Sequence, residues 1–203
     1  MKKVWLPAWM LVMFLTAASV LSAMEAPMDV VRNTTDEVLS RAKSDRDGLR
    51  QDPAKMYGLV SEVIFPHFDF PIMAQWVLGT HWKSASKDTR TDFVQQFRKL
   101  LVRTYAAALL EFSDEVISYP DDNAIAKGRT VVVRQEIEQA GSEPILLGYR
   151  LHNTGDYWKV FDVSVDGVSL VKTYRASFSS LIRDRGLASL IDSLSAKNKE
   201  INQ

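Results

Sequence analysis

Histidine and aspartate are the side chains of this sequence best suited to acid–base chemistry. The three histidines, His67, His81 and His152, are far apart along the chain. His67 and Asp69 are two residues apart beside prolines, a spacing at which a carboxylate can orient an imidazole as a general base. The same spacing fits a turn in which Asp69 caps a following helix. We favour the capping role.

Motifs for metal binding, nucleophilic catalysis and phosphate binding are missing from the sequence. It has no His-x-x-x-His or Glu-x-x-His pair at helical spacing, and it has no cysteine to act as a thiolate ligand or nucleophile. It also has no Gly-x-Ser-x-Gly elbow and no glycine-rich phosphate loop, and its nine glycines mark turns. We therefore expect no catalytic residue, no metal site and no cofactor.

The charge balance argues against a nucleic-acid partner. Lysine and arginine together number 25, as do aspartate and glutamate, so the formal net charge is zero. No basic stripe that would follow a phosphate backbone is present. The lack of cysteine also excludes disulfides and the cysteine-linked lipid anchor of a bacterial lipoprotein.

The first 23 residues have the composition of a secretory signal peptide. Two lysines precede an apolar run from Val4 to about Leu15, and small residues then lead to Ala23. We expect cleavage near Ala23 and export, which leaves residues 24–203 as a single domain. A membrane anchor is the alternative, since residues 4–21 are barely long enough to span a bilayer.

Apolar residues recur with helical spacing through the first half of the chain. The expected helices cover residues 27–43, 53–65, 72–78 and 87–112. The longest of them carries an apolar stripe along one face. Asp166-Gly167 suits a hairpin turn, but the apolar spacing after it is helical, with an interruption at Gly186.

Between these helical regions the apolar period changes to two residues. The expected strands cover residues 116–119, 126–139, 145–152 and 157–165. They are joined by turns rich in Gly, Asn and Asp, and each has one apolar face that helices can cover. Helices, then about four antiparallel strands, then helices predict an α+β fold.

The expected elements carry more large apolar side chains than any motif accounts for. The long helix, the short helix around Trp76, one face of the strands and the helix after Gly167 all contribute to this excess. A stripe of this kind usually belongs to a plain core. Patterning alone does not distinguish a filled core from a lined cavity.

The segment from Trp158 to Phe178 resembles the signature of the MlaC family, the toluene-tolerance auxiliary proteins that carry phospholipid in the periplasm of Gram-negative bacteria. Its elements are a Trp-Lys-Val strand, Asp162, the turn Gly167-Val168-Ser169-Leu170, then Tyr174-Arg175 and Phe178. The upstream segments similar to the same family are Phe68-Asp69-Phe70 with Met73, Gly79-x-x-Trp82, the stripe of Phe93, Phe97, Leu101 and Tyr105, and Gly148-Tyr149-Arg150-Leu151. The resemblance covers nearly the whole chain.

The resemblance implies a fold related to the NTF2-like folds, in which helices wrap a twisted antiparallel sheet and a deep apolar pocket lies between them. It implies a monomeric periplasmic carrier, whose bound phospholipid is cargo rather than a cofactor. The implied partners are an outer-membrane lipoprotein–porin complex and an inner-membrane ABC transporter with an MCE-domain subunit. Shuttling between them would maintain the lipid asymmetry of the outer membrane.

The apolar faces of the expected elements supply the candidates for the lining of such a pocket. Trp76 is expected to close one end. The expected lining residues are Trp76, Leu101, Tyr105, Leu109, Val131, Val133, Leu147, Tyr149, Phe161, Val163, Val168, Val171, Tyr174 and Phe178. For each of them, lining a pocket and packing in a core remain equally open.

Two other classes of function also remain open. A small enzyme of the same fold type would use the pocket and would need His67, Asp69 or Asp162 to converge inside it. An assembly module of the cell envelope would have a solid core instead. The cavity distinguishes these classes, because a solid core has almost none, a small substrate needs a few hundred Å³, and two acyl chains need a deep cleft.

Overall fold

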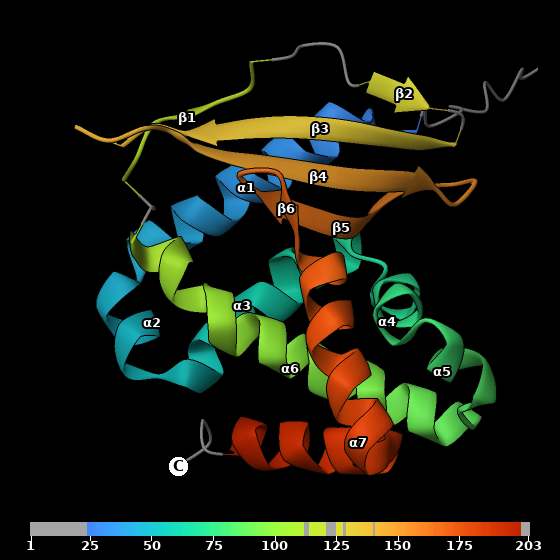
Figure 1. Cartoon of the computed structure of the whole chain (residues 1–203). Coiled ribbons are helices and arrows are strands. Elements are labelled where there is room, and N and C mark those ends of the chain that lie inside the picture. Colours follow the sequence, from blue (N-terminus) through green and yellow to red (C-terminus); the bar gives the residue numbers. More distant parts are fainter. Residues whose placement is uncertain (1–23, 112–113, 121–124, 128, 140, 200–203) are drawn as a thin grey trace, which may run out of the picture.

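The computed structural model describes residues 24–111, 114–120, 125–127, 129–139 and 141–199 (Figure 1). The expected signal peptide, residues 1–23, lies outside them. The elements are α1 (Pro27–Ser44), α2 (Arg46–Gln51), α3 (Pro53–Val63), the 3-10 turn η1 (Phe65–His67), α4 (Phe70–Leu78), α5 (Thr80–Ser84), α6 (Lys87–Glu111), β1 (Ile117–Ser118), β2 (Ile125–Lys127), β3 (Thr130–Ile137), β4 (Ile145–Asn153), β5 (Trp158–Val165), β6 (Val168–Ser169) and α7 (Leu170–Lys199). The predicted α+β class is confirmed.

All named strands pair in an antiparallel manner, in the order β1-β3-β4-β5-β6, and β2 also pairs with β3. The long strands β3, β4 and β5 form the centre, with Val133 opposite Tyr149 and Tyr149 opposite Val163. The prediction of one strand over 126–139 is wrong, because this segment forms the hairpin of β2 and β3 with Lys127 opposite Thr130. Lys127 and Thr130 are only three residues apart, so the interruption is too short to separate two strands in a pattern that is judged over a longer window.

A second tight hairpin joins the sheet to the last helix. Asp166 (φ 48°) and Gly167 (φ 80°) both have positive φ, and Val165 lies opposite Val168. Positive φ at both central residues is typical of a type I′ hairpin turn, and Asp-Gly is a preferred pair for it. The chain therefore forms the short strand β6 before α7. The sequence had predicted that a helix would follow the Asp166-Gly167 turn immediately.

Asp162 fixes the start of α7. This carboxylate is 2% exposed and accepts hydrogen bonds from the Val171 backbone N–H (3.2 Å) and the Ser169 hydroxyl (2.7 Å). Unpaired N–H groups at a helix start are stabilised by such acceptors. The helix that begins here is interrupted at Gly186, with φ 82° and ψ 162°, as predicted.

Three apolar clusters hold the layers together. The helical core joins α4, the first half of α6, α7 and Phe161 of β5; Phe93 and Phe97 are its fully buried centre. A second cluster joins α1, α2, α3 and the second half of α6, and a third packs the start of α1 onto β3, β4 and β5. Figure 1 shows α1 against the sheet and the other long helices beyond the β5 edge. Among the described residues, no helix is both long enough and apolar enough to cross a membrane.

Candidate functional site

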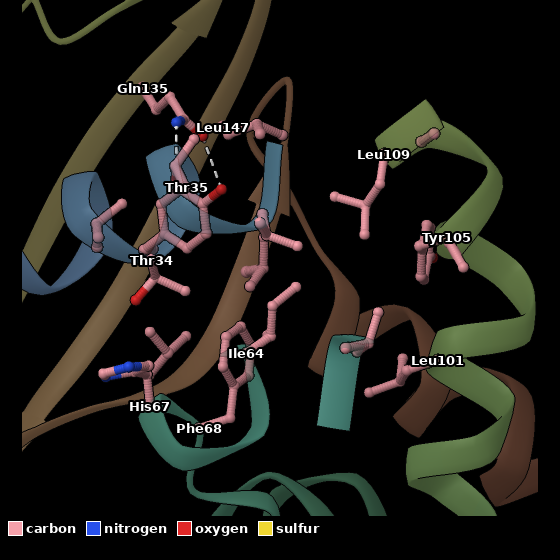
Figure 2. Close-up of a pocket in the computed structure, with 18 of the residues that line it drawn as sticks. Thr34, Thr35, Ile64, His67, Phe68, Leu101, Tyr105, Leu109, Gln135 and Leu147 are labelled. Atoms are coloured by element: carbon pink, nitrogen blue, oxygen red, sulfur yellow. Dashed lines mark hydrogen bonds between the residues drawn. The ribbon is translucent and has the colours of Figure 1, made fainter. Parts of the chain in front are cut away.

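A cavity of about 410 Å³ lies between the sheet and helices α1, α3 and α6 (Figure 2). It occupies the region where the second and third apolar clusters meet. Among the residues that the structure describes, twenty-eight line it, and none of these is an aspartate, glutamate, lysine or arginine. The polar lining residues are Thr34, Thr35, His67, Tyr105, Gln135 and Tyr149. The cavity is thus suited to an uncharged, mostly apolar ligand.

Helix α6 forms one wall. Leu101, Tyr105 and Leu109 are four residues apart, so they project from one face of the helix, and Figure 2 shows all three facing the cavity. Earlier on the same helix, Phe93 and Phe97 are fully buried in the helical core. One apolar stripe therefore serves a packed core in its first half and a cavity in its second.

The opposite wall comes from the sheet and from α1. Leu147 and Tyr149 of β4 and Val163 of β5 share the face that points to the cavity. Helix α1 adds lining residues that the sequence analysis did not propose: Val30, Val31, Thr34, Thr35, Val38 and Leu39. The available signal was the spacing of the apolar residues in the first helix, which mark a face that needs a partner.

A cluster of polar side chains, hydrogen-bonded to one another, lies in this apolar wall. The Gln135 amide nitrogen donates to the Thr35 hydroxyl (3.1 Å) and to the Tyr119 hydroxyl (3.0 Å), and Tyr149 donates to the Gln135 amide oxygen (2.7 Å). Gln135 is 1% exposed, so its partners are essential, because an unpaired amide in such a place is costly. These bonds connect α1 to the sheet across the back of the cavity.

Tyr105 and Tyr149 of the cavity, and Tyr119 beside it, stay neutral over the physiological pH range. Burial raises the pKa of Tyr149, and it also raises the pKa of Tyr119. Burial, and after it a hydrogen bond with Tyr174, raises the pKa of Tyr105 to about 12. The cavity therefore gains no charge from these groups below about pH 10.

Six of the fourteen expected lining residues face the cavity: Leu101, Tyr105, Leu109, Leu147, Tyr149 and Val163. Whether these six contact a lipid stays a prediction. Val131 and Val133 are buried under α1 in the third cluster. Phe161, Val171, Tyr174 and Phe178 pack in or against the helical core. Trp76, 48% exposed, lies beside Phe161 with its ring tilted by 40° to the Phe161 ring. Val168 is exposed at the sheet end.

A β-bulge explains why Phe161 does not line the cavity. The register of β4 and β5 shifts between Arg150 and Leu151, so that Val160 pairs with Leu151 while Val163 pairs with Tyr149. An extra residue in one strand turns a side chain to the other face. Val160 consequently faces the cavity and Phe161 faces the helical core.

The three groups that an enzyme would need do not meet in the cavity. His67 lines it, but Asp69 caps α4 through the Ile72 N–H (3.1 Å) and pairs with His152 (2.9 Å). Asp162 caps α7, and its carboxylate lies 3.6 Å from the Arg150 guanidinium. In the described part of the chain, no three His, Asp or Glu side chains gather closely enough to hold a metal ion.

Comparisons with known proteins agree with this architecture. Residues 32–196 match the model of the family described as MlaC protein. The intermembrane phospholipid transport system binding protein MlaC of Haemophilus influenzae is 27% identical over 169 residues, which are 82% of this chain and 79% of that protein. The toluene tolerance protein ttg2D of Pseudomonas putida is 25% identical over 165 residues, 81% of this chain and 76% of that protein.

A solved structure shows the same fold. It is a phospholipid-binding protein from Ralstonia solanacearum in complex with a phospholipid, and it is 30% identical in sequence with a TM-score of 0.80. The match covers 88% of this chain and all of that one.

Proposed function

This chain belongs to the MlaC family, and from that premise we propose that it is a carrier that holds phospholipid acyl chains in the cavity between its sheet and helices. The observation that carries the proposal is the lining, whose described residues include no Asp, Glu, Lys or Arg side chain. The relative from Ralstonia solanacearum, with the same fold, is in complex with a phospholipid. The acyl chains would lie inside, and the phosphate would stay in solvent, because burying it unpaired is costly.

The volume of the cavity argues against a solid core but does not by itself select a lipid. About 410 Å³ lies within the range of ordinary small-molecule pockets. The selection comes from chemistry, because a polar substrate would find few hydrogen-bond partners here. Gln135, the most buried polar side chain of the lining, already uses its amide groups on Thr35, Tyr119 and Tyr149.

A carrier of this kind solves an energetic problem. Two acyl chains expose on the order of 30 methylene groups in water at ~0.8 kcal/mol each, or roughly 24 kcal/mol. A cavity that resembles hydrocarbon removes most of this cost, so a lipid can cross an aqueous compartment and leave at either end.

The compartment, the partners and the purpose of the carrier are proposed from its membership of the MlaC family. We propose that residues 24–203 act in the periplasm as a monomer, after removal of residues 1–23. The carrier would exchange phospholipid between an outer-membrane lipoprotein–porin complex and an inner-membrane MCE-domain ABC transporter, and so maintain outer-membrane lipid asymmetry. It would do so without catalysis, since His67, Asp69 and Asp162 have separate structural places.

Native mass spectrometry of the protein purified without detergent, followed by organic extraction, tests this function. We expect bound masses that match phospholipid. Leu147→Glu places a carboxylate in the cavity and should empty it, and Leu147→Trp should reduce occupancy by filling it without charge. The control Leu181→Glu changes a residue of α7 that is 41% exposed and lies outside the lining, and should keep its lipid. A folded wild-type protein that is empty and takes no lipid from vesicles contradicts the proposal.

A further inference from the structure

A second pocket, of about 370 Å³, lies where the start of α1, η1 and the start of β5 come together. The described residues that line it are Met24, Glu25, Val30, Pro66, His67, Tyr157, Trp158 and Lys159. Most of these side chains are apolar or aromatic, and Glu25 and Lys159 carry opposite charges. The second pocket is therefore mainly apolar, and neither sign of charge dominates it.

The second pocket shares two lining residues, Val30 of α1 and His67 of η1, with the cavity of about 410 Å³ (the main cavity). On β5 the two spaces follow each other along one face of the strand. Val160 lines the main cavity, and Trp158, two residues earlier, lines the second pocket. The residue after η1, Phe68, forms a parallel bridge with Val160, so η1 and β5 are in contact here. Val30 and His67 consequently form a partition between two adjoining spaces.

This partition lies on the side of the main cavity away from α6. Figure 2 shows His67 across the cavity from Leu101, Tyr105 and Leu109, with its ring nitrogens pointing away from α6. An acyl chain that lies in the main cavity along the direction from α6 to η1 therefore ends against Val30 and His67.

Beyond the partition, the second pocket leaves apolar side chains in solvent. Met24 is 40% exposed and Tyr157 is 67% exposed, whereas Val30 is 4% exposed. An apolar chain that passes the partition would cover part of this surface. Each methylene group that is buried there instead of staying in water strengthens binding about fourfold, the equivalent of ~0.8 kcal/mol.

We propose that the second pocket extends the main cavity and receives the methyl ends of the longer acyl chains of a phospholipid, and that Val30 and His67 set the chain length beyond which it is used. The inference rests on the proposed carrier function and deepens it, because it assigns chain-length preference to named side chains. A phosphate headgroup fits the second pocket less well. Lys159 would attract the phosphate, but Glu25 in the same lining would repel it, and the remaining lining is mainly apolar.

Photo-cross-linking locates the end of the acyl chain directly. The probes are distearoyl and dilauroyl phosphatidylglycerol with a diazirine at the methyl end of one chain, and distearoyl phosphatidylglycerol with a diazirine in the headgroup. After uptake from vesicles and irradiation, we expect peptide mapping to find the stearoyl end on Met24 and on residues 157–159, and the lauroyl end only on the main cavity. A stearoyl end found only on the main cavity, or a headgroup found on the second pocket, overturns the inference.

Competition between distearoyl and dimyristoyl phosphatidylglycerol, read by native mass spectrometry, adds a second test. Val30→Ala opens the partition and should shift the bound ratio toward distearoyl by at least about fourfold, because one or more further methylene groups gain access. His67→Trp enlarges the partition and should shift the ratio the opposite way.

The matched control is Val38→Ala. Val38 lies on the same helix, is 3% exposed and lines the main cavity but not the second pocket. Its variant loses the same atoms and should keep a ratio close to that of the wild type, whatever its effect on total lipid. Equal ratios in the Val30→Ala and Val38→Ala variants overturn the inference. The carrier function fails separately, if the wild-type protein neither contains lipid when purified nor takes either lipid from vesicles.

Discussion

The imidazole of His152 and the carboxylate of Asp69 lie 2.9 Å apart, from Nε2 to Oδ2, and so connect β4 to the start of α4. The other carboxylate oxygen of Asp69 accepts the Ile72 N–H, and the Asp69 N–H donates to the Val160 carbonyl at 2.8 Å. One residue thus joins a helix start to two strands. This explains why Asp69 does not orient His67, although only one residue separates them in sequence.

Asp69→Ala should lower stability without emptying the cavity. The substitution removes a helix cap and the partner of His152, so we expect a loss of about 1–2 kcal/mol in the free energy of unfolding. Urea denaturation measures this loss, and native mass spectrometry follows the lipid. Asp92→Ala, at an exposed position of α6, serves as the control. Loss of lipid at unchanged stability would contradict a purely structural role.

Gln135→Leu should destabilise the protein even though it makes the wall more apolar. It leaves the hydroxyls of Thr35, Tyr119 and Tyr149 without their shared partner, and a buried group left unpaired costs about 1–3 kcal/mol. The matched change Gln95→Leu, on the exposed side of α6, should cost less than about 0.5 kcal/mol. Equal urea midpoints for the two variants would show that the Gln135 bonds do not hold α1 on the sheet.

Sequence periodicity was sufficient to predict the longer helices, the strands β4 and β5 and the fold class, because these depend on local spacing. It could not divide the apolar residues between core and cavity. Phe97 and Leu101 are neighbours on one apolar stripe of α6, yet the Phe97 ring packs against the Phe178 ring, whereas Leu101 lines the cavity. That division depends on where α7 and the sheet end, which is tertiary information. The bulge that turns Phe161 away is likewise invisible to a period of two.

Asp162→Ala should be more damaging than removal of an exposed carboxylate. Two donors, the Val171 N–H and the Ser169 hydroxyl, lose a buried charged acceptor. Hydrogen bonds to charged groups contribute about 1.5–3 kcal/mol each, so we expect a loss of at least about 3 kcal/mol and a lower melting temperature. Asp184→Ala, exposed on α7, should melt close to the wild type. A similar melting temperature for both variants would contradict the capping role.

Stability should fall in strongly alkaline solution partly through Tyr105. Its pKa is about 12 in the folded protein, against about 10 in an unfolded chain. Below pH 10 both states hold the proton and the stability is complete; as pH rises from 10 to 12 the unfolded state ionises first and is favoured. Solvent screening weakens the effect, since Tyr105 is 38% exposed.

The difference in urea midpoint between wild type and Tyr105→Phe isolates this contribution from the other tyrosines. The wild type should lose more stability than the variant between pH 10 and 12. Parallel curves over that interval would show that Tyr105 ionises equally in both states.

Because of the cavity, shortening a side chain should lower stability by different amounts in the core and in the cavity lining. A core side chain such as Phe97 has neighbours on every side, so shortening it removes many contacts and leaves a void. Leu101 and Leu147 already border open space, and shortening them removes fewer contacts. Selection can therefore alter the shape of the cavity over evolutionary time with little loss of foldability, so that its ligand preference can change on an unchanged scaffold.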